Sequence, residues 1–160
     1  MLQVINLAID EILISTPYFI PGESLLAALT IAALSGISVK LLVPGISDSA
    51  FVNAAARSYY GDLLRAGVEI YQYSRGFIHA KTLVADGKIA IVGTANMDFR
   101  SFDLNFEVNA IVYDSETASE LRRVFEDLKT AEKIDAGIWD NRPWYKQLLE
   151  KVARLVSPLL

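Results

Sequence analysis

The stretch FIHAKTLVADGKIAIVGTANMD, from Phe77 to Asp98, decides how the second half of this chain folds. Apolar runs stand on both sides of Asp86-Gly87, a pattern typical of two strands joined by a two-residue turn. The chain's single histidine, His79, lies two residues before Lys81 in the first of these runs. The stretch therefore predicts an antiparallel hairpin with a polar pair on an otherwise apolar strand.

The polar pair is expected on one face of its strand. Side chains alternate across a strand, so His79 and Lys81 point the same way, roughly 6 to 7 Å apart, while Asp86 has the opposite parity. An ammonium so close disfavours the protonated imidazole and keeps His79 neutral and nucleophilic near pH 7. A phosphate between them would be held by the lysine and open to attack by the imidazole. Asp86 is expected to serve the turn.

Further polar residues follow at the end of the next strand. Gly93 permits close approach of the backbone to a ligand, and Thr94 and Asn96 offer short hydrogen-bonding groups, which together suggest a phosphate cradle. The strand expected after it, 105–113, is taken as a central strand and carries three polar residues on one face. They need partners or form a site. These residues are Asn105, Glu107 and Asn109.

Each candidate has a structural alternative. His79 could be a hydrogen-bonded core histidine, Lys81 could protect a sheet edge against aggregation, and Glu107 could be a solvated carboxylate. The sequence GTAN could simply end a strand. Their joint occurrence on consecutive strand segments favours a phosphate site.

The first half of the chain alternates strands with helices. Gly36 and Gly67 stand where helix C-terminal glycines belong. This βαβαβ series predicts parallel strands, and the shorter connections of the second half predict antiparallel neighbours in the same sheet. We expect an α/β fold with a mixed, largely parallel sheet and helices on both faces. The expected elements are strand 11–17, helix 23–35, strand 37–43, helix 50–66, strand 68–73 and strands 77–85, 88–93 and 105–113.

The last part of the chain is predicted to be helical. A helix should run from Ser115 to about Ile134, and Pro143 suits the first turn of another. We divide the chain into a lobe, residues 1–135, and a linker with a C-terminal amphipathic helix, residues 136–160. This helix could pack its apolar stripe on the lobe or lie at a membrane surface. The stripe is Leu148, Val152 and Leu155, and Trp144, Tyr145, Lys146, Lys151 and Arg154 would meet the headgroups.

Composition excludes several classes of protein. At 160 residues one domain is expected, and the longest apolar run, Leu25 to Leu34, is shorter than a membrane span. The first residues lack the basic segment of a signal peptide. The absence of cysteine rules out disulfides and thiolate metal sites, and a net charge of −4 disfavours a nucleic-acid-binding surface.

The spacing of these residues resembles a known signature. His79-Ala80-Lys81, then Asp86, then Gly93-Thr94-Ala95-Asn96 is similar to the HxKxxxxDxxxxxxG[ST]xN motif of the phospholipase D superfamily. The stretches STPYFIPGESLLAAL and NMDFRSFDLNFEVNA resemble the second, C-terminal catalytic half of bacterial cardiolipin synthases. The resemblance covers essentially the whole chain and implies a phospholipase D-like α/β/α sandwich.

The resemblance also implies roles. His79, Lys81, Asp86 and Glu107 would form the catalytic group: His79 attacks phosphorus, Glu107 accepts the imidazole N–H, and Asp86 holds local structure. Lys81, Thr94 and Asn96 would bind the substrate phosphate. No metal and no other cofactor is implied.

One departure from the family is large. The family's site uses two histidines from two such motifs, whereas this chain has one. The chain would thus be half an active site, completed by a second lobe from the same full-length chain or by a homodimer mate. Because its sequence resembles a second half, we favour a truncated bilobal enzyme.

The implied reaction joins two phosphatidylglycerols into cardiolipin and glycerol through a phosphohistidine. The alternatives are a hydrolytic phosphodiesterase or nuclease acting as a homodimer, and a catalytically silent isolated lobe. The expected partners are a phospholipid and a membrane surface, with no nucleic acid. The expected location is the cytoplasmic face of a bacterial cell membrane for the anchored enzyme, with this fragment itself soluble.

Overall fold

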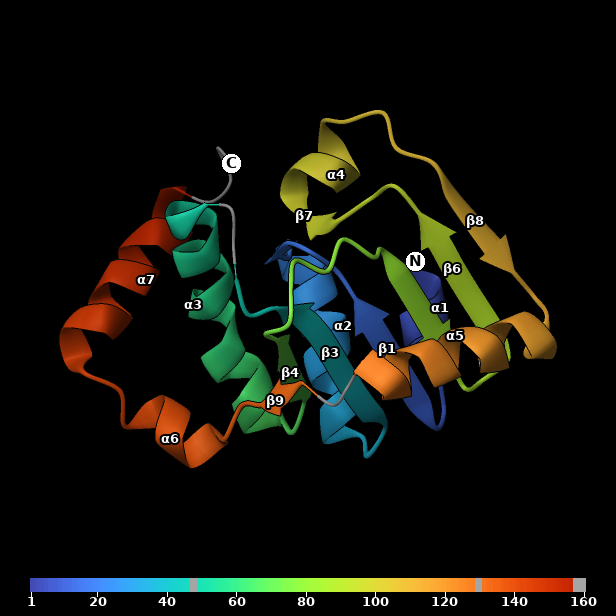
Figure 1. Ribbon diagram of the computed structural model, residues 1–160, viewed down its shortest axis with the longest axis horizontal. Helices are drawn as coiled ribbons and strands as arrows, with labels where there is room; N and C mark the ends of the chain where they lie inside the picture. Colours follow the sequence, from blue (N-terminus) through green and yellow to red (C-terminus); the bar gives the residue numbers. More distant parts are fainter. Residues whose placement is uncertain (47–48, 129–130, 157–160) are drawn as a thin grey trace.

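A seven-stranded mixed sheet lies between layers of helices in the computed structural model, which describes residues 1–46, 49–128 and 131–156 (Figure 1). The sheet has the order β8-β6-β5-β1-β3-β4-β9. Its strands are β1 (Glu11–Ser15), β3 (Ser38–Pro44), β4 (Glu69–Tyr73), β5 (Thr82–Ala85), β6 (Ile89–Gly93), β8 (Asn109–Val112) and β9 (Glu132–Lys133). A second, two-stranded sheet pairs β2 (Phe19–Ile20) with β7 (Met97–Asp98). The helices are α1 (Leu2–Leu7), α2 (Glu23–Leu34), α3 (Ala50–Ala66), α4 (Phe99–Asp103), α5 (Ser115–Leu128), α6 (Ala136–Asp140) and α7 (Trp144–Val156).

The sheet is mixed, as predicted, but it is less parallel than expected. In the larger sheet, β1 pairs with β3 and β3 with β4 in parallel, and every other pairing within the described ranges is antiparallel. The reason is the hairpin between β5 and β6: β5 pairs antiparallel with β1, and β6 pairs antiparallel with β5. Lys81 lies just before β5, and its carbonyl accepts the Gly93 N–H of β6 at 3.2 Å. The interpretation of Lys81 as an edge-strand lysine is therefore wrong.

Helices cover both faces of the sheet, which confirms the α/β sandwich (Figure 1). Strand β1 is buried on both sides: Ile12 and Ile14 join the core under α1, α2 and α3, and Leu13 joins the core under α5. Ala118 and Phe125 supply the buried face of α5. A strand buried on both faces reads as a continuous apolar run, as EILIS does.

The turn chemistry of the hairpin agrees with the prediction. Asp86 and Gly87 both have positive φ, +53° and +59°, and the Lys88 N–H donates to the Ala85 carbonyl at 3.0 Å. Positive φ at both central residues matches the twist of antiparallel strands. Gly36 and Gly67 likewise follow α2 and α3 in the left-handed region.

Three predicted elements have different bounds. Strand β5 begins at Thr82 instead of 77, and β8 begins at Asn109 instead of 105, at the edge of the sheet instead of its middle. Helix α5 ends at Leu128, because Glu132 and Lys133 pair with β4 instead of continuing a helix. Residues 129–130, within the helix predicted to reach 134, lie outside the described residues.

Helices α6 and α7 lie beside α3, on the far side from β8 (Figure 1). Trp139 of α6 is buried against Tyr60, with ring centroids 5.4 Å apart, and the guanidinium groups of Arg57 and Arg142 stand over its ring. The expected apolar stripe of α7 does not pack on the lobe: Leu155 is 82% exposed. Instead, Glu150 and Ala153 are its buried residues, so the helix packs against α3 through a face other than the expected stripe. The predicted segment's last residues, 157–160, lie outside the described residues.

In the described part of the chain, no helix has both the length and the apolar character needed to cross a bilayer.

Candidate functional site

His79 and Lys81 meet directly. Both lie in the irregular segment that leads from β4 into β5, and the Lys81 carbonyl accepts the Gly93 N–H of β6 at 3.2 Å. Lys81 Nζ stands 3.0 Å from His79 Nε2 and donates to the His79 carbonyl oxygen at 3.2 Å. His79 is exposed, and its ring stacks on Phe77 with centroids 5.7 Å apart. An ammonium and an accepting imidazole nitrogen therefore share one open surface.

The charge on Lys81 is set by opposing effects. Burial lowers the pKa of Lys81 below its usual value, and the carboxylates of Glu107 and Asp98 partly offset this by favouring the ammonium. Both carboxylates are thus within electrostatic reach of the amine. Asp98 was not identified from the sequence.

Thr94 and Asn96, the other predicted phosphate-binding residues, make different contacts within the lobe. The Thr94 hydroxyl accepts the Val108 N–H at 3.0 Å, and the Thr94 N–H donates to the Val108 carbonyl at 3.0 Å, so Thr94 also fastens the loop before β8. The Asn96 N–H donates to Ser101 Oγ at 3.1 Å. Asn96 Oδ1 is buried and has no hydrogen-bond partner in the described residues. An unpaired buried amide oxygen costs free energy, so this lobe leaves the cradle incomplete.

Gly93 allows a close approach of another chain segment, not of a ligand. A Cβ at this position would collide with the Val108 carbonyl oxygen and with Asn109. The close approach expected from this glycine is therefore real, but it is to the neighbouring chain segment before β8. The prediction that Gly93 makes room for a ligand is corrected accordingly.

Glu107 lies in the irregular segment before β8. Its carboxylate accepts from Asn105 Nδ2 at 3.3 Å, and it forms no hydrogen bond with His79 within the part of the chain that the structure describes. The expected face of three polar residues on a central strand is wrong, because residues 105–108 are not in a strand. Apolar side chains flank Glu107: Phe106 is fully exposed and Val108 is 75% exposed.

Asp86 stands at the other end of β5, away from this group. Its carboxylate accepts the backbone N–H groups of Ile9, Asp10 and Glu11, with the shortest contacts at 2.9 Å. Burial opposes its ionisation, but these hydrogen bonds outweigh burial and hold the pKa of Asp86 below its usual range. Asp86 thereby fastens the start of β1 to the hairpin.

Two residues that position the site, Thr16 and Asp98, were not predicted. The Thr16 hydroxyl accepts the Met97 N–H at 3.2 Å and donates to the Tyr18 carbonyl at 2.7 Å, which joins the small sheet to the end of β1. Asp98 caps α4 by accepting the Ser101 N–H at 2.7 Å. The Asp98 cap could have been found, because aspartate before a short helix is a common N-cap.

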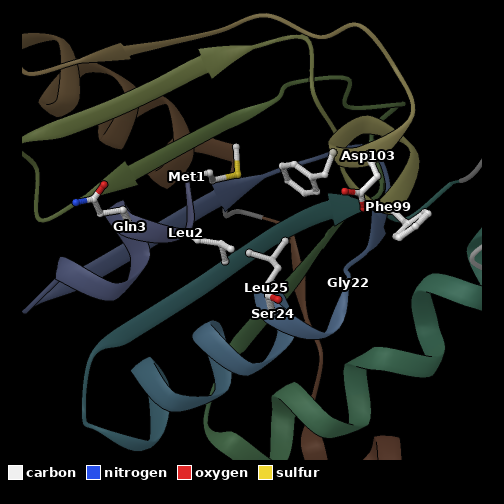
Figure 2. Close-up of a pocket in the computed structure, with 9 residues that line it drawn as sticks. Met1, Leu2, Gln3, Gly22, Ser24, Leu25, Phe99 and Asp103 are labelled. Atoms are coloured by element: carbon white, nitrogen blue, oxygen red, sulfur yellow. The ribbon is translucent and has the colours of Figure 1, made fainter.

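A largely apolar cavity of about 460 Å³ lies between α1, the start of α2 and α4 (Figure 2). Leu2, Leu25, Phe99 and Phe102 line it, and Asp103 is its one acidic side chain. None of the motif residues lines this cavity, so the reactive pair does not open into it.

No group of three histidine, aspartate or glutamate side chains comes together to hold a metal ion within residues 1–46, 49–128 and 131–156. The polar groups of the site are instead suited to an anion: a lysine, a hydroxyl, an amide and an imidazole.

Comparisons with known proteins show which family and which relatives this chain resembles. Residues 1–129 match the family model described as "Cardiolipin synthase, PLD-like domain". The chain is 52% identical over 160 residues to the major cardiolipin synthase ClsA of Bacillus subtilis, and 50% identical over 158 residues to a cardiolipin synthase of a Geobacillus species. These alignments cover 99% and 98% of this chain but 33% and 32% of the relatives, so the chain spans about a third of their length.

Solved structures show the same fold. The phospholipase D family member Nuc from Salmonella typhimurium superimposes with a TM-score of 0.71 at 21% identity, over 83% of this chain and 87% of Nuc. A phosphatidylserine synthase of Haemophilus influenzae superimposes with a TM-score of 0.72 at 16% identity, over 99% of this chain and 43% of that one. At these identities the likeness concerns the fold alone.

Proposed function

Because the chain belongs to the PLD-like domain family of cardiolipin synthase, we propose that it is one of two catalytic lobes of a phosphatidyl transferase. The reaction joins two phosphatidylglycerols into cardiolipin and releases glycerol. The observation that carries the proposal is the contact of 3.0 Å between Lys81 Nζ and His79 Nε2 on an open surface. This contact supports a site in which His79 is the nucleophile and Lys81 is the cation that binds the phosphate.

The first step uses groups of this chain. Lys81, as an ammonium, donates to the lone pair of His79 Nε2. A substrate phosphate whose non-bridging oxygens take up that ammonium frees the lone pair. The Nε2–P bond then forms as the P–O bond to the headgroup glycerol of the first phosphatidylglycerol breaks, which gives a phosphohistidine. Thr94 and Asn96 would add hydrogen bonds to the phosphoryl oxygens.

The second half of the reaction needs groups that this chain lacks. The leaving alkoxide must take up a proton, and the acceptor hydroxyl must lose one as it attacks phosphorus and releases Nε2. Such proton transfer contributes typically 10²- to 10⁴-fold. With one histidine in the sequence, we assign this role to a second lobe, from the same full-length chain or from a homodimer mate.

The rim of the site supports a second lobe. Leu104, Phe106 and Val108 are 64%, 107% and 75% exposed, and they adjoin in sequence Glu107, whose carboxylate favours the Lys81 ammonium. Large apolar side chains gathered on a surface mark a contact site. A lobe seated there would cover this rim, restrict water, and bring Glu107 to the imidazole N–H that it does not reach in the lobe alone.

Asp86, the remaining residue of the family's motif, does not act on the substrate. We assign Asp86 a structural role within the catalytic motif, because its carboxylate is engaged by three backbone N–H groups. Lys81 remains the site's cation, and no cofactor takes part in the proposed reaction.

Two alternatives use the same site. In a hydrolytic phosphodiesterase or nuclease, water resolves the phosphohistidine; the net charge of −4 disfavours a nucleic-acid substrate. A silent isolated lobe would fold without turnover. The proposed place of the whole enzyme is the cytoplasmic face of a bacterial cell membrane.

The test gives radiolabelled phosphatidylglycerol and a labelled oligonucleotide to the full gene product. We expect labelled cardiolipin and free glycerol from the lipid, and an intact oligonucleotide. Phosphatidic acid as the main product would support hydrolysis, and nucleotide release would support a nuclease. A parallel assay of residues 1–160 alone addresses the silent lobe.

A further inference from the structure

Helix α7 is held with its polar side inward. Glu150 is buried and accepts from Arg57 Nε at 3.0 Å and from Arg142 Nη1 at 2.7 Å. Arg154 Nη1 donates to Asp62 at 2.9 Å, and its guanidinium stands over the Tyr59 ring. These contacts fix the rotation of the helix about its own axis against α3.

The opposite side of α7 is apolar and faces outward. Leu148 and Val152 are 51% exposed, Leu149 is 65% exposed and Leu155 is 82% exposed, and Trp144 and Tyr145 extend the same side at the start of the helix. We call these six residues the outer face of α7. An amphipathic helix on a globular protein normally buries its apolar side. Here the ion pairs present that side to the surroundings.

The charges of α7 fit an anionic surface. Of its four charged residues, three are basic, and the single acid, Glu150, is buried in its ion pairs. The exposed charges are Lys146 and Lys151. Lysine is depleted at the centres of protein–protein contacts, whereas basic residues beside tryptophan, tyrosine and leucine are typical of helices in the interface of a bilayer.

We propose that the outer face of α7 docks on an anionic phospholipid bilayer. The helix would lie in the plane of the interface, with its leucines at the acyl boundary and Lys146 and Lys151 at the headgroups. This inference rests on the proposed function, because a lobe that takes phosphatidylglycerol must meet the membrane. It adds a contact for the bilayer that is separate from the phosphate site.

The test measures binding of the 160-residue chain to phosphatidylserine vesicles by co-sedimentation and by tryptophan emission. Phosphatidylserine supplies the anionic surface without the proposed substrate. We expect binding, with a shift of emission to shorter wavelengths that Trp144→Phe removes and buried Trp139 does not replace. The double variant Leu148→Gln/Leu155→Gln should lower the partition coefficient roughly tenfold or more.

Matched controls separate the face from general hydrophobicity and from charge. Ile31→Gln/Leu34→Gln alters two equally exposed residues of α2, 64% and 70%, and should leave vesicle binding unchanged. Lys146→Gln/Lys151→Gln should lower binding to anionic vesicles by roughly fivefold per lysine. Melting curves of all variants should match the parent, since the altered side chains are exposed.

Three results would overturn the proposal: no vesicle binding by the parent chain, equal binding by Leu148→Gln/Leu155→Gln, or loss of self-association in that variant without loss of vesicle binding. The last result would assign the outer face to a second copy of the chain. Turnover of dispersed short-chain phosphatidylglycerol by the full gene product needs no bilayer. Failure of that turnover would therefore count against the proposed function alone.

Discussion

One sequence motif supplies residues at both ends of strand β5, and the two ends differ in role. The end before β5 carries the reactive pair, and the end after it carries a structural carboxylate. At the entrance, His79 and Lys81 contact each other on an open surface, where the carboxylates of Glu107 and Asp98 favour the Lys81 ammonium. At the exit, Asp86 is engaged by three backbone N–H groups and one tight turn. The difference shows how to separate a reactive residue from a structural one: the reactive end is left unsatisfied by its own lobe.

The largest expected effect is that of His79→Ala in the full gene product. We expect transfer to fall by roughly 10⁴-fold or more, as for loss of a nucleophile in other enzymes. Melting should be unchanged, because His79 is exposed. The measurement is formation of radiolabelled cardiolipin. Activity above a few per cent of the parent would place the nucleophile in the other lobe.

The next effect compares the two lysines of the hairpin. Lys81→Ala should lower turnover roughly 10²- to 10³-fold, because the site loses the cation that stabilises the phosphoryl oxygens. Lys88→Ala, at the opposite end of the hairpin, should change turnover less than about twofold. Equal losses of turnover in the two variants would contradict the assignment of the reactive site to the His79 and Lys81 end of β5.

The pH profile sharpens the same comparison. Burial lowers the pKa of Lys81, so the ammonium should be lost, and turnover should decline, at a pH below the ordinary lysine value of about 10.4. Glu107→Gln removes a carboxylate that favours the ammonium. Its alkaline limb should therefore move to lower pH. An unmoved limb in Glu107→Gln would show that Lys81 does not set it.

Gly93→Ala tests the approach of β6 to the segment before β8. The added Cβ meets a carbonyl oxygen and the backbone of Asn109, so we expect a loss of about 1–3 kcal/mol in the free energy of unfolding. Gly22→Ala is the control, since its Cβ would meet nothing within 4 Å. Urea denaturation measures both. Equal stability of the two variants would mean that β8 can shift freely.

The smallest effect is that of Asp86→Asn, and it should fall on stability. The folded-state pKa of Asp86 is lowered, so its contribution is present above about pH 4 and is lost as pH falls through the folded pKa. We expect the free energy of unfolding of this variant to be about 1–2 kcal/mol below that of the parent at pH 7. This difference should become smaller in acid. Glu107→Gln should keep parental melting and lose more turnover. Parental melting with no turnover in Asp86→Asn would contradict the structural assignment.

Much of this organisation could be predicted from the sequence. The Asp-Gly pair predicted the hairpin, because local backbone chemistry decides such a turn. The parity argument for His79 and Lys81 assumed a strand from residue 77, but both residues lie before β5, which begins at Thr82. The segment 105–108 could not be predicted, because alternation shows which residues avoid water and not what covers them. Phe106 and Val108 alternate with Glu107 as they would in a strand, yet they are exposed in this lobe.

The sequence contained a signal for the end of α5, but the helix was predicted to run too far. Apolar residues at helical spacing stop at Leu128, which is where the helix ends, and the pairing of Lys133 with Tyr71 depends on an edge of β4 that no local pattern reveals. The prediction of which face of α7 packs on the lobe failed for a similar reason. Its apolar stripe was visible, but Arg57 and Arg142, which turn Glu150 inward, act through the tertiary fold.

The central claim is that this chain holds half of a two-part phosphoryl-transfer site. Its most direct test is analytical ultracentrifugation of residues 1–160 together with a lipid-transfer assay across the same concentrations. The account predicts a folded species that forms no cardiolipin as a monomer, with any turnover appearing only as the chain associates. Robust transfer by a species shown to be monomeric would contradict it.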